Sequence, residues 1–300
     1  MKIKLGTRAS NLALIQANSI KRALEEAHPQ LEVDLVKIST HGDRVQNKSI
    51  ADLGQKGVFV KEIEQALLDG TIDLAVHSLK DMPSLIHPDL TLVAPPKGEA
   101  PEDAFVGKGP LSSWKDLEGM KIGSGSNRRQ AQLKHWLGQV QIEPIRGNIE
   151  TRMKKIDQLG LDGTLLAYSG LIRGGYKERV SLVLDPKKFI PSPNQGILAL
   201  EIRRDREDLA ELLAPLAHGR TAFRMEVERA FQEALSATCE SPIGIYLDFE
   251  RAQEDQLDIY TCYGKEVGSA LYFQEASCRL DEAKKTVIAL AKTLKECAHD

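Results

Sequence analysis

The stretch that decides the fold is Asp73-Leu-Ala-Val-His-Ser-Leu-Lys-Asp-Met-Pro83. Residues 73–76 follow the turn signal Asp69-Gly70 and are mostly apolar but too few for a helix, so they predict a short buried strand. The apolar run ends at His77, and Pro83 prevents a smooth helical continuation. Open α/β sheets bind ligands beyond the carboxyl ends of their strands, which makes Lys80 and Asp81 candidate site residues. The simpler alternative is a solvated strand end that carries an ion pair.

Strand-like and helix-like segments alternate around this stretch. We expect strands at residues 2–6, 31–38 and 91–94, and helices at residues 11–27 and 58–68. This βαβα order predicts a largely parallel sheet covered by helices. The polar segment between residues 39 and 57 is long for a loop, a property of lids and of disordered segments.

The same alternation repeats after the break at Pro95-Pro96-Lys97-Gly98. We expect strands at 121–123, 140–145, 165–168, 197–202, 257–260 and 270–273, and helices at 127–137, 148–159, 221–235 and 281–296. The repeat predicts two α/β lobes with a hinged cleft and a small C-terminal α+β domain. The expected boundaries are 1–96 with 197–216 for the first lobe, 97–196 for the second, and 217–300 for the C-terminal domain.

The composition is that of an ordinary globular protein. The chain has 300 residues, 42% hydrophobic and 28% charged, and a net charge of −3. This balance gives no global basic field for nucleic acid or membranes. The first residues of the chain have a strand-like pattern rather than that of a signal peptide, so we expect a cytoplasmic protein without one. Four widely spaced cysteines form no Cys-x-x-Cys pair, which argues against a zinc site or a disulfide framework.

Basic and hydroxyl side chains recur just beyond the predicted strands. They are Arg8 and Ser10; Lys80; Ser124, Ser126, Arg128 and Arg129; Arg146, Asn148 and Arg152; and Ser169 and Arg173. The carboxyl ends of parallel strands share one edge of a sheet, so these groups should converge on a ligand site. Arginine forks and helix N-termini suit a polyanion that carries carboxylates or phosphates. Taken singly, each arginine has the alternative of a surface salt bridge.

Two further motifs are weaker. Gly123-Ser-Gly-Ser-Asn-Arg128 resembles a dinucleotide-binding loop, but Arg128 stands where that loop has its third glycine. Cys239 follows a predicted helix and precedes Pro242 and Gly244, a setting in which a thiol can be exposed. A lone cysteine is nevertheless most often an inert structural residue.

Together these motifs resemble the porphobilinogen deaminase (hydroxymethylbilane synthase) family. The resemblance is collinear over nearly the whole chain. It covers Gly6–Ser10, Lys56–Glu62, Val76–Pro83, Arg128–Gln130, Arg146–Arg152, Gly170–Arg173, Asn194–Gly196, and Cys239 with Pro242–Gly244. The family fold, two periplasmic-binding-protein-like lobes with a small third domain, agrees with the reading above.

The resemblance implies a transferase of porphyrin and haem biosynthesis. Such an enzyme deaminates four porphobilinogen units and joins them into the linear tetrapyrrole hydroxymethylbilane. It implies a covalent dipyrromethane cofactor on Cys239 and a catalytic Asp81. It implies cofactor binding by Lys80, Ser126, Arg128 and Arg129, and substrate binding by Arg8, Ser10, Lys56, Phe59, Arg146, Arg152 and Arg173. The implied protein is a monomer with no metal, nucleic-acid or membrane partner.

The chain departs from the family pattern at several positions. Ala237-Thr238 and Glu240-Ser241 flank the cysteine where the family usually has Gly-Gly and Gln-Val. Asp52 stands at a frequent lysine position of the lid. Gly125 and Asn127 replace a serine and a leucine, and Asn194 replaces a glycine.

Two rival functions remain open from the sequence. The first is a binding module that senses an acidic metabolite without chemistry. The second is a deaminase paralogue that loads the cofactor but turns over poorly. A bound dipyrromethane adds mass, so intact mass separates the first rival from the enzyme, whereas only an activity assay separates the second.

Overall fold

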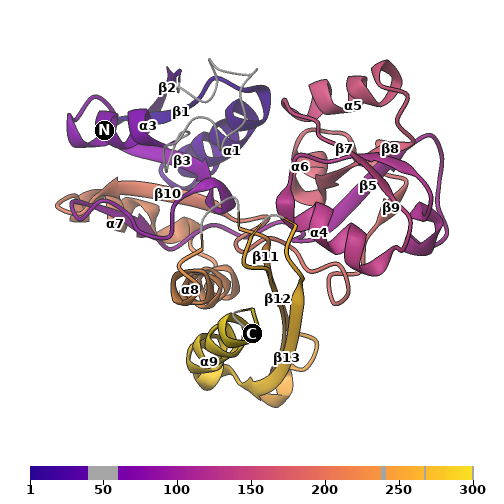
Figure 1. Ribbon diagram of the computed structural model, residues 1–300. Coiled ribbons are helices and arrows are strands. Elements are labelled where there is room, and N and C mark those ends of the chain that lie inside the picture. Colours follow the sequence, from indigo (N-terminus) through magenta and orange to yellow (C-terminus); the bar gives the residue numbers. More distant parts are fainter. Residues whose placement is uncertain (40–59, 238–240, 267, 299–300) are drawn as a thin grey trace. The chain divides into compact units, whose positions relative to one another are not determined.

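The computed structural model describes residues 1–39, 60–237, 241–266 and 268–298 (Figure 1). The chain divides into two compact units, Met1–Glu99 with Gly196–Met225 and Ala100–Gln195 with Glu226–Asp300. In the described residues the first unit contains one sheet and the second unit contains two. The expected mixed α/β class is therefore confirmed. The three domain boundaries expected from the sequence stay a prediction.

The sheet of the first unit has the strand order β2-β1-β3-β10-β4. Its strands are β1 (Lys2–Arg8), β2 (Glu32–Ile38), β3 (Leu74–Ser78), β4 (Leu90–Val93) and β10 (Leu198–Arg203). β1 is parallel to β2 and β3, while β10 is antiparallel to both β3 and β4. The sheet is mixed: the expected parallel pairing joins β2, β1 and β3, whereas both pairings of β10 are antiparallel. The expected return of the segment after Ile197 to this sheet is confirmed.

Helices cover both faces of this sheet. They are α1 (Asn11–Ala27), α3 (Lys61–Leu68) and α7 (Glu207–Leu213). Leu24 of α1 and Leu213 of α7 join one apolar cluster with Leu5 and Leu200 of the strands. Ile63 and Leu67 of α3 pack in a separate cluster with Ala75 of β3. Because successive strand residues point to opposite faces, β3 separates the two clusters.

The first sheet of the second unit has the order β7-β6-β8-β5-β9. Its strands are β5 (Asp103–Gly107), β6 (Lys121–Gly123), β7 (Gln141–Glu143), β8 (Gly163–Ala167) and β9 (Leu182–Val183). β6 is parallel to β7 and β8, and β5 is antiparallel to β8 and β9. The sequence reading missed β5, which begins with a buried aspartate, and β9, which is only 2 residues long.

Helices also flank this second sheet on both faces. They are α4 (Asn127–Trp136), α5 (Ile149–Gln158) and α6 (Tyr168–Arg173). Leu133 of α4 packs with Phe105 and Leu165 of the strands. Ile156 of α5 and Leu171 of α6 belong to a different cluster with Val106. The helices therefore begin at the carboxyl ends of β6, β7 and β8, as the βα alternation predicted.

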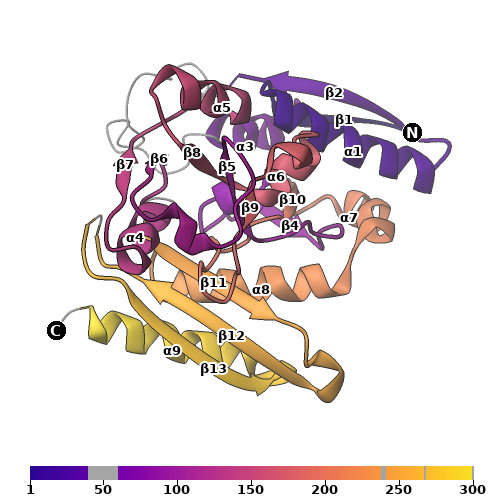
Figure 2. The ribbon, with the colours of Figure 1, turned by 90° about the vertical axis from the view of Figure 1, so that its right-hand side faces the viewer.

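The third sheet consists of antiparallel strands in the order β11-β12-β13. They are β11 (Ile243–Asp248), β12 (Gln256–Tyr263) and β13 (Tyr272–Arg279), accompanied by α8 (Gly219–Ala234) and α9 (Ala283–Cys297). α9 lies along β12 and β13, as Figure 2 shows. On the sheet's other face, Cys262 packs with Ile190 and with Ala131 of α4. The strand expected at 270–273 overlaps β13 only at residues 272 and 273.

Candidate functional site

In the first unit, the candidate residues lie at the carboxyl edge of the sheet. β1 and β3 are adjacent and parallel, with Leu5 opposite Leu74 and Gly6 opposite Ala75. Arg8 is the last residue of β1, and Ser10 caps α1 immediately after it. Lys80 and Asp81 lie in a short 3₁₀ helix, Leu79–Asp81, that follows β3 directly. The strand register thus brings these four residues to one edge, as predicted.

The turn after β3 is anchored by its apolar residues. Leu79 and Met82 are 1% and 0% exposed and pack with Ile197 and Ala199 of the β10 segment. The backbone N–H of Leu79 also donates to the carbonyl of Ile197 at 3.0 Å. Lys80 between them is half-buried and Asp81 is exposed. The turn therefore presents a cation and a carboxylate outward from a fixed apolar base.

In the second unit, basic residues gather at the carboxyl edge of the parallel strands β6, β7 and β8. Ser126 follows β6, Arg146 and Arg152 follow β7, and Arg173 ends the helix that follows β8. All four side chains are half-buried. The N-termini of α4 and α5 lie at the same edge and add backbone N–H donors and positive dipole ends. This edge can bind carboxylates.

The loop between β7 and α5 is held by its own basic residues. Arg152 donates from Nε to the carbonyl of Gly147 at 2.8 Å, and Lys155 donates from Nζ to the carbonyl of Arg146 at 3.0 Å. Gly147 has φ +116°, and a Cβ at this position would lie 2.5 Å from Thr151. The loop therefore requires glycine, and the contact to Gly147 fixes the position of Arg152.

Arg128 and Arg129 occupy a buried position rather than the exposed edge. They are 4% and 5% exposed and both bind Asp103, which is 0% exposed. Arg128 donates from Nη1 to the carbonyl of Ile190 at 2.7 Å. Arg129 donates from Nη1 to the carbonyl of Leu165 at 3.0 Å. In this structure the pair thus ties α4 to the core of the second unit.

The charge state of this cluster follows from its surroundings. Burial by itself would raise the pKa of Asp103, but the guanidinium groups of Arg128 and Arg129 outweigh it and hold that pKa well below its usual range. Burial lowers the pKa of Arg128, opposed by the charge of Asp103. Arginine nevertheless stays protonated in proteins. Two guanidinium charges against one carboxylate leave the cluster with a net positive charge, which favours an acidic ligand nearby.

Gln195 and Asn194 connect this cluster to the chain segment that leaves the second unit. Gln195 donates from Nε2 to Oδ1 of Asp103 at 3.0 Å and to the carbonyl of Pro101 at 2.6 Å. Asn194, at the position where the family usually has glycine, has φ +62°. Asparagine tolerates this left-handed conformation better than most non-glycine residues, which explains the departure.

The hydroxyl candidates have structural tasks of their own. Ser10 accepts from the backbone N–H of Ala13 at 3.4 Å, and Ser126 accepts from that of Arg129 at 3.5 Å. Both serines therefore act as N-caps. A serine immediately before a predicted helix is the sequence signal for this role. Three other predicted residues, Lys56, Phe59 and Cys239, lie outside the described residues, as does the departure at Asp52.

The sequence reading missed Asp103 and did not assign Gln195 a role. A charged residue at the head of the apolar run Ala104-Phe105-Val106 was the available signal, because a charge on a buried strand needs a partner. The family resemblance implied that Arg128 and Arg129 bind the cofactor, and the sequence analysis identified no buried counter-charge for them. Their positions were predicted correctly at a strand end, whereas their burial was not predicted.

The chain matches known proteins over most of its length. The family model "Porphobilinogen deaminase, dipyromethane cofactor binding domain" matches residues 3–211. A porphobilinogen deaminase of Natranaerobius thermophilus is 39% identical, over 99% of this chain and 94% of the relative. One of Clostridium novyi is 38% identical, over 99% of both chains. Among solved structures, the methionine binding protein MetQ matches 78% of this chain and 94% of its own at 13% identity, with a TM-score of 0.44.

The fold is α/β, and each unit carries cationic side chains at the carboxyl edge of its parallel strands, a feature that suits an acidic ligand. The chain belongs to the porphobilinogen deaminase family. It is accordingly a transferase of tetrapyrrole synthesis that acts on porphobilinogen and has a dipyrromethane cofactor. Within the described ranges, none of the helices has the length and apolar character needed to cross a membrane.

Proposed function

We propose that this chain joins four porphobilinogen units, with loss of ammonia from each, into hydroxymethylbilane on a dipyrromethane primer attached to Cys239. The observation that carries the proposal is the strand-end group of the first unit. There Lys80 and Asp81 follow β3 directly, and Arg8 ends the neighbouring parallel strand. A cation beside an exposed carboxylate suits a substrate that carries carboxylates and develops a positive charge.

Asp81 is the proposed catalytic residue. When ammonia leaves porphobilinogen, the remaining pyrrole carries a positive charge that a nearby carboxylate stabilises. Asp81 is exposed on a turn whose flanking residues Leu79 and Met82 are buried, so its carboxylate is presented from a fixed base. The same carboxylate can accept hydrogen bonds from pyrrole N–H groups and take up the proton released on bond formation.

The substrate-binding role falls to side chains that match the acetate and propionate carboxylates of the pyrroles. We assign it to Arg8, Ser10, Arg146, Arg152 and Arg173, and to Lys56 and Phe59 outside the described residues. Arginine binds carboxylates through two parallel N–H···O bonds. The arginines at the edge of β6, β7 and β8 are half-buried, a setting in which charge-assisted hydrogen bonds are screened less than at an open surface.

The donor chemistry of the proposed cofactor residues fits an acidic dipyrromethane. When bound, the dipyrromethane supplies the terminal pyrrole to which the first substrate unit is joined. Lys80 supplies an ammonium group at the strand edge, and Ser126 supplies a hydroxyl at the start of α4. Arg128 and Arg129 are already bonded to Asp103. They contribute the net positive charge of that cluster and the guanidinium N–H groups that the bonds to Asp103 do not use.

The experiment is an intact-mass measurement combined with an assay for tetrapyrrole. The wild-type protein should carry the mass of dipyrromethane and convert porphobilinogen into a product that cyclises to uroporphyrin. Cys239→Ser should lose both properties, and its melting temperature should fall because a bound group stabilises the native state. Adduct or tetrapyrrole formation by Cys239→Ser would overturn the attachment site.

The remaining cysteines supply the controls. Cys297 is half-buried at the end of α9, and Cys297→Ser should keep both adduct and activity. Cys278→Ser and Cys262→Ser should also keep the adduct. Burial raises the pKa of the Cys262 thiol to about 12, which leaves it protonated and unreactive.

We further propose that the enzyme works in the cytoplasm as a monomer without nucleic acid. Gel filtration of the purified protein tests its oligomeric state.

A further inference from the structure

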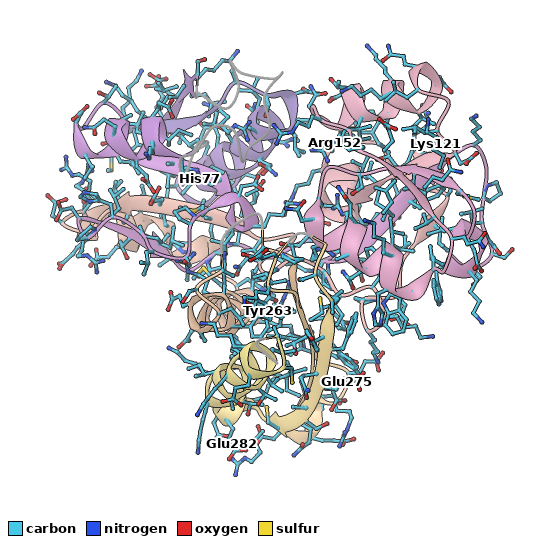
Figure 3. The ribbon with its side chains drawn as sticks, in the orientation of Figure 1. His77, Lys121, Arg152, Tyr263, Glu275 and Glu282 are labelled. Carbon is cyan, nitrogen blue, oxygen red and sulfur yellow. The ribbon has the colours of Figure 1, made fainter. Side chains whose placement is uncertain are left out.

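A buried pair joins two strands of the first unit just before the Lys80–Asp81 turn. His77 Nε2 lies 3.1 Å from Oε2 of Glu201, and the two side chains are 4% and 0% exposed. His77 pairs with Ala199 in the antiparallel register of β3 and β10, so Glu201 is its diagonal neighbour on the same face. Figure 3 labels His77 among the elements of the first unit. The Nε2 atom of His77 can donate to this oxygen in the tautomer that carries its hydrogen there.

Two carboxylate oxygens of this region have no hydrogen-bond partner within the described part of the chain. They are Oε1 of Glu201 and Oε1 of Glu64, and both atoms are buried. Glu64 belongs to α3, which packs on β3 and β10. It interacts electrostatically with both Glu201 and His77. An unpaired buried acceptor is unfavourable, and two such acceptors on neighbouring carboxylates call for a common explanation.

We propose that Glu64 is protonated in the folded protein, that its carboxyl O–H donates to Oε1 of Glu201, and that the chain Glu64–Glu201–His77 holds the Lys80–Asp81 turn in position. In this arrangement Glu201 accepts at both of its oxygens, from Glu64 on one side and from His77 on the other. One proton therefore satisfies both unpaired oxygens.

The surroundings favour the protonated form of Glu64. Burial raises its pKa above the ordinary value of 4.5, the charge of Glu201 raises it further, and His77, His87 and Lys61 oppose the shift. The neighbouring elements place further charged residues on this face of the sheet by strand alternation: Lys4 and Arg8 on β1, and Arg203 on β10. Apolar clusters around Ala75 and Ala199 flank the chain on the same face and limit access by water.

The connection to the turn runs through β10. β10 and the residue before it anchor the end of β3 twice, once through His77 and Glu201 and once through the Leu79 N–H to Ile197 carbonyl bond of 3.0 Å. The second anchor is followed directly by Lys80 and Asp81. Loss of the first anchor should therefore displace the turn. Glu64, Glu201 and His77 are thus positioning residues for the proposed catalytic residue Asp81. This part of the inference rests on the proposed role of Asp81.

Infrared spectroscopy tests the proton by itself. A protonated carboxyl group has a carbonyl stretching band that an ionised carboxylate lacks. At pH 7 the wild-type protein should show this band and Glu64→Gln should not, since the glutamine amide replaces the acid as donor. The matched control Glu211→Gln, at an exposed position of α7, should keep it. Absence of the band in the wild type, or its persistence in Glu64→Gln, would overturn the proposed proton.

Steady-state kinetics tests the positioning role. Glu64→Ala, which leaves Oε1 of Glu201 without a donor, should lower kcat about tenfold with KM within about twofold of wild type. Glu64→Gln should restore kcat to within about twofold, because its amide still donates. Equal kcat in wild type and Glu64→Ala, or an equal loss in both variants, would refute the positioning role.

Two further measurements keep the outcomes distinguishable. If Glu64→Ala does not fold, the pH profile of kcat decides: the wild-type kcat should fall at alkaline pH as Glu64 loses its proton, and that of Glu64→Gln should not. Superimposable profiles would then refute the positioning role. If Asp81→Asn keeps the wild-type kcat, the positioning role falls together with the proposed role of Asp81, whereas the infrared band still tests the proton.

Discussion

Asp103 accepts two hydrogen bonds from Arg129 through a single oxygen, with Oδ1 at 3.1 Å from Nε and 2.7 Å from Nη2. Its other oxygen accepts from Nη2 of Arg128 at 2.7 Å. One buried carboxylate thus holds two guanidinium groups that would otherwise repel each other inside the second unit. Because these arginines lie in the first turn of α4, Asp103 helps to fix the start of this helix and the position of its N-cap Ser126.

Asp103→Asn should strongly destabilise the protein. The amide keeps the shape of the side chain but removes the counter-charge of two buried guanidinium groups. Breaking a buried ion pair in this way costs about 3–5 kcal/mol of unfolding free energy. Urea denaturation of the variant measures the loss. The control Asp157→Asn, at an exposed position on α5 of the same unit, should change the unfolding free energy by less than about 0.5 kcal/mol. Equal midpoints for both variants would contradict the structural role of Asp103.

The same residue should dominate part of the acid unfolding. The folded-state pKa of Asp103 lies below its ordinary value of 3.8, so the folded protein binds fewer protons at this site than the unfolded chain. The stability from this group is therefore fully present above 3.8 and is lost as the pH falls below that value toward the folded-state pKa. Asp103→Asn should show a shallower loss of melting temperature than wild type in that range. Parallel melting curves against pH would refute this assignment.

Asn194 offers a test of backbone strain. It is 1% exposed and has φ +62°, and its N–H donates to Glu228. Its side-chain amide N–H donates to Gln232 at a long 3.4 Å. Both Asn194→Gly and Asn194→Ala remove that amide, so their difference isolates the backbone. Asn194→Ala should be less stable than Asn194→Gly by about 1 kcal/mol, because alanine disfavours the left-handed region. Chemical denaturation of the two variants side by side measures the difference, and equal stability would mean that the strain is absent.

Gly125 should not tolerate the serine that the family usually has at this position. A Cβ at Gly125 would lie 2.4 Å from the backbone carbonyl oxygen of Ile145, and backbone cannot move aside as a side-chain tip can. Gly125→Ser should therefore lower the unfolding free energy by about 1–3 kcal/mol. Gly109→Ser is the matched control, since no atom lies within 4 Å of a Cβ there. A melting temperature of Gly125→Ser equal to that of the control would show that the β6–α4 loop adapts.

Local patterns in the sequence predicted most of the fold. The helix expected at residues 11–27 ends where the structure ends it, because Ser10 caps its start and Pro29 follows its end. The strand expected at residues 73–76 corresponds to β3, but β3 continues through His77 and Ser78. His77 looked like the end of the apolar run, and only the tertiary partner Glu201 makes its burial favourable. Periodicity alone cannot show such a partner, which is 124 residues away.

The sequence predicted which candidate residues lie at the ends of strands, but it did not predict the burial or the partners of their side chains. Arg8, Lys80 and Asp81 were expected at one edge, and the register of β1 and β3 places them there. Arg128 and Arg129 were expected to bind the cofactor, which stays a prediction, and the structure shows that both also bind the buried Asp103. A sequence shows where basic residues follow strands, but it does not show which of them is already paired with a carboxylate distant in the sequence.

Asp81 provides the most direct test of the proposed chemistry. Asp81→Asn keeps the size and hydrogen-bonding shape of the side chain at an exposed turn, so the fold and the melting temperature should be preserved. The variant removes the negative charge that faces the developing cation of the substrate. Loss of a preorganised electrostatic group lowers kcat by roughly a hundredfold or more.

Single-turnover rates with porphobilinogen measure the effect of Asp81→Asn, and intact mass shows whether the cofactor is still loaded. Asp89→Asn is the matched control, since Asp89 is also exposed in the first unit and its side chain is 77% exposed. That variant should keep the wild-type rate. A near-wild-type rate in Asp81→Asn would exclude the proposed role. A loss of both adduct and rate would instead assign Asp81 to cofactor assembly, because the carboxylate would then be needed before any substrate unit is joined.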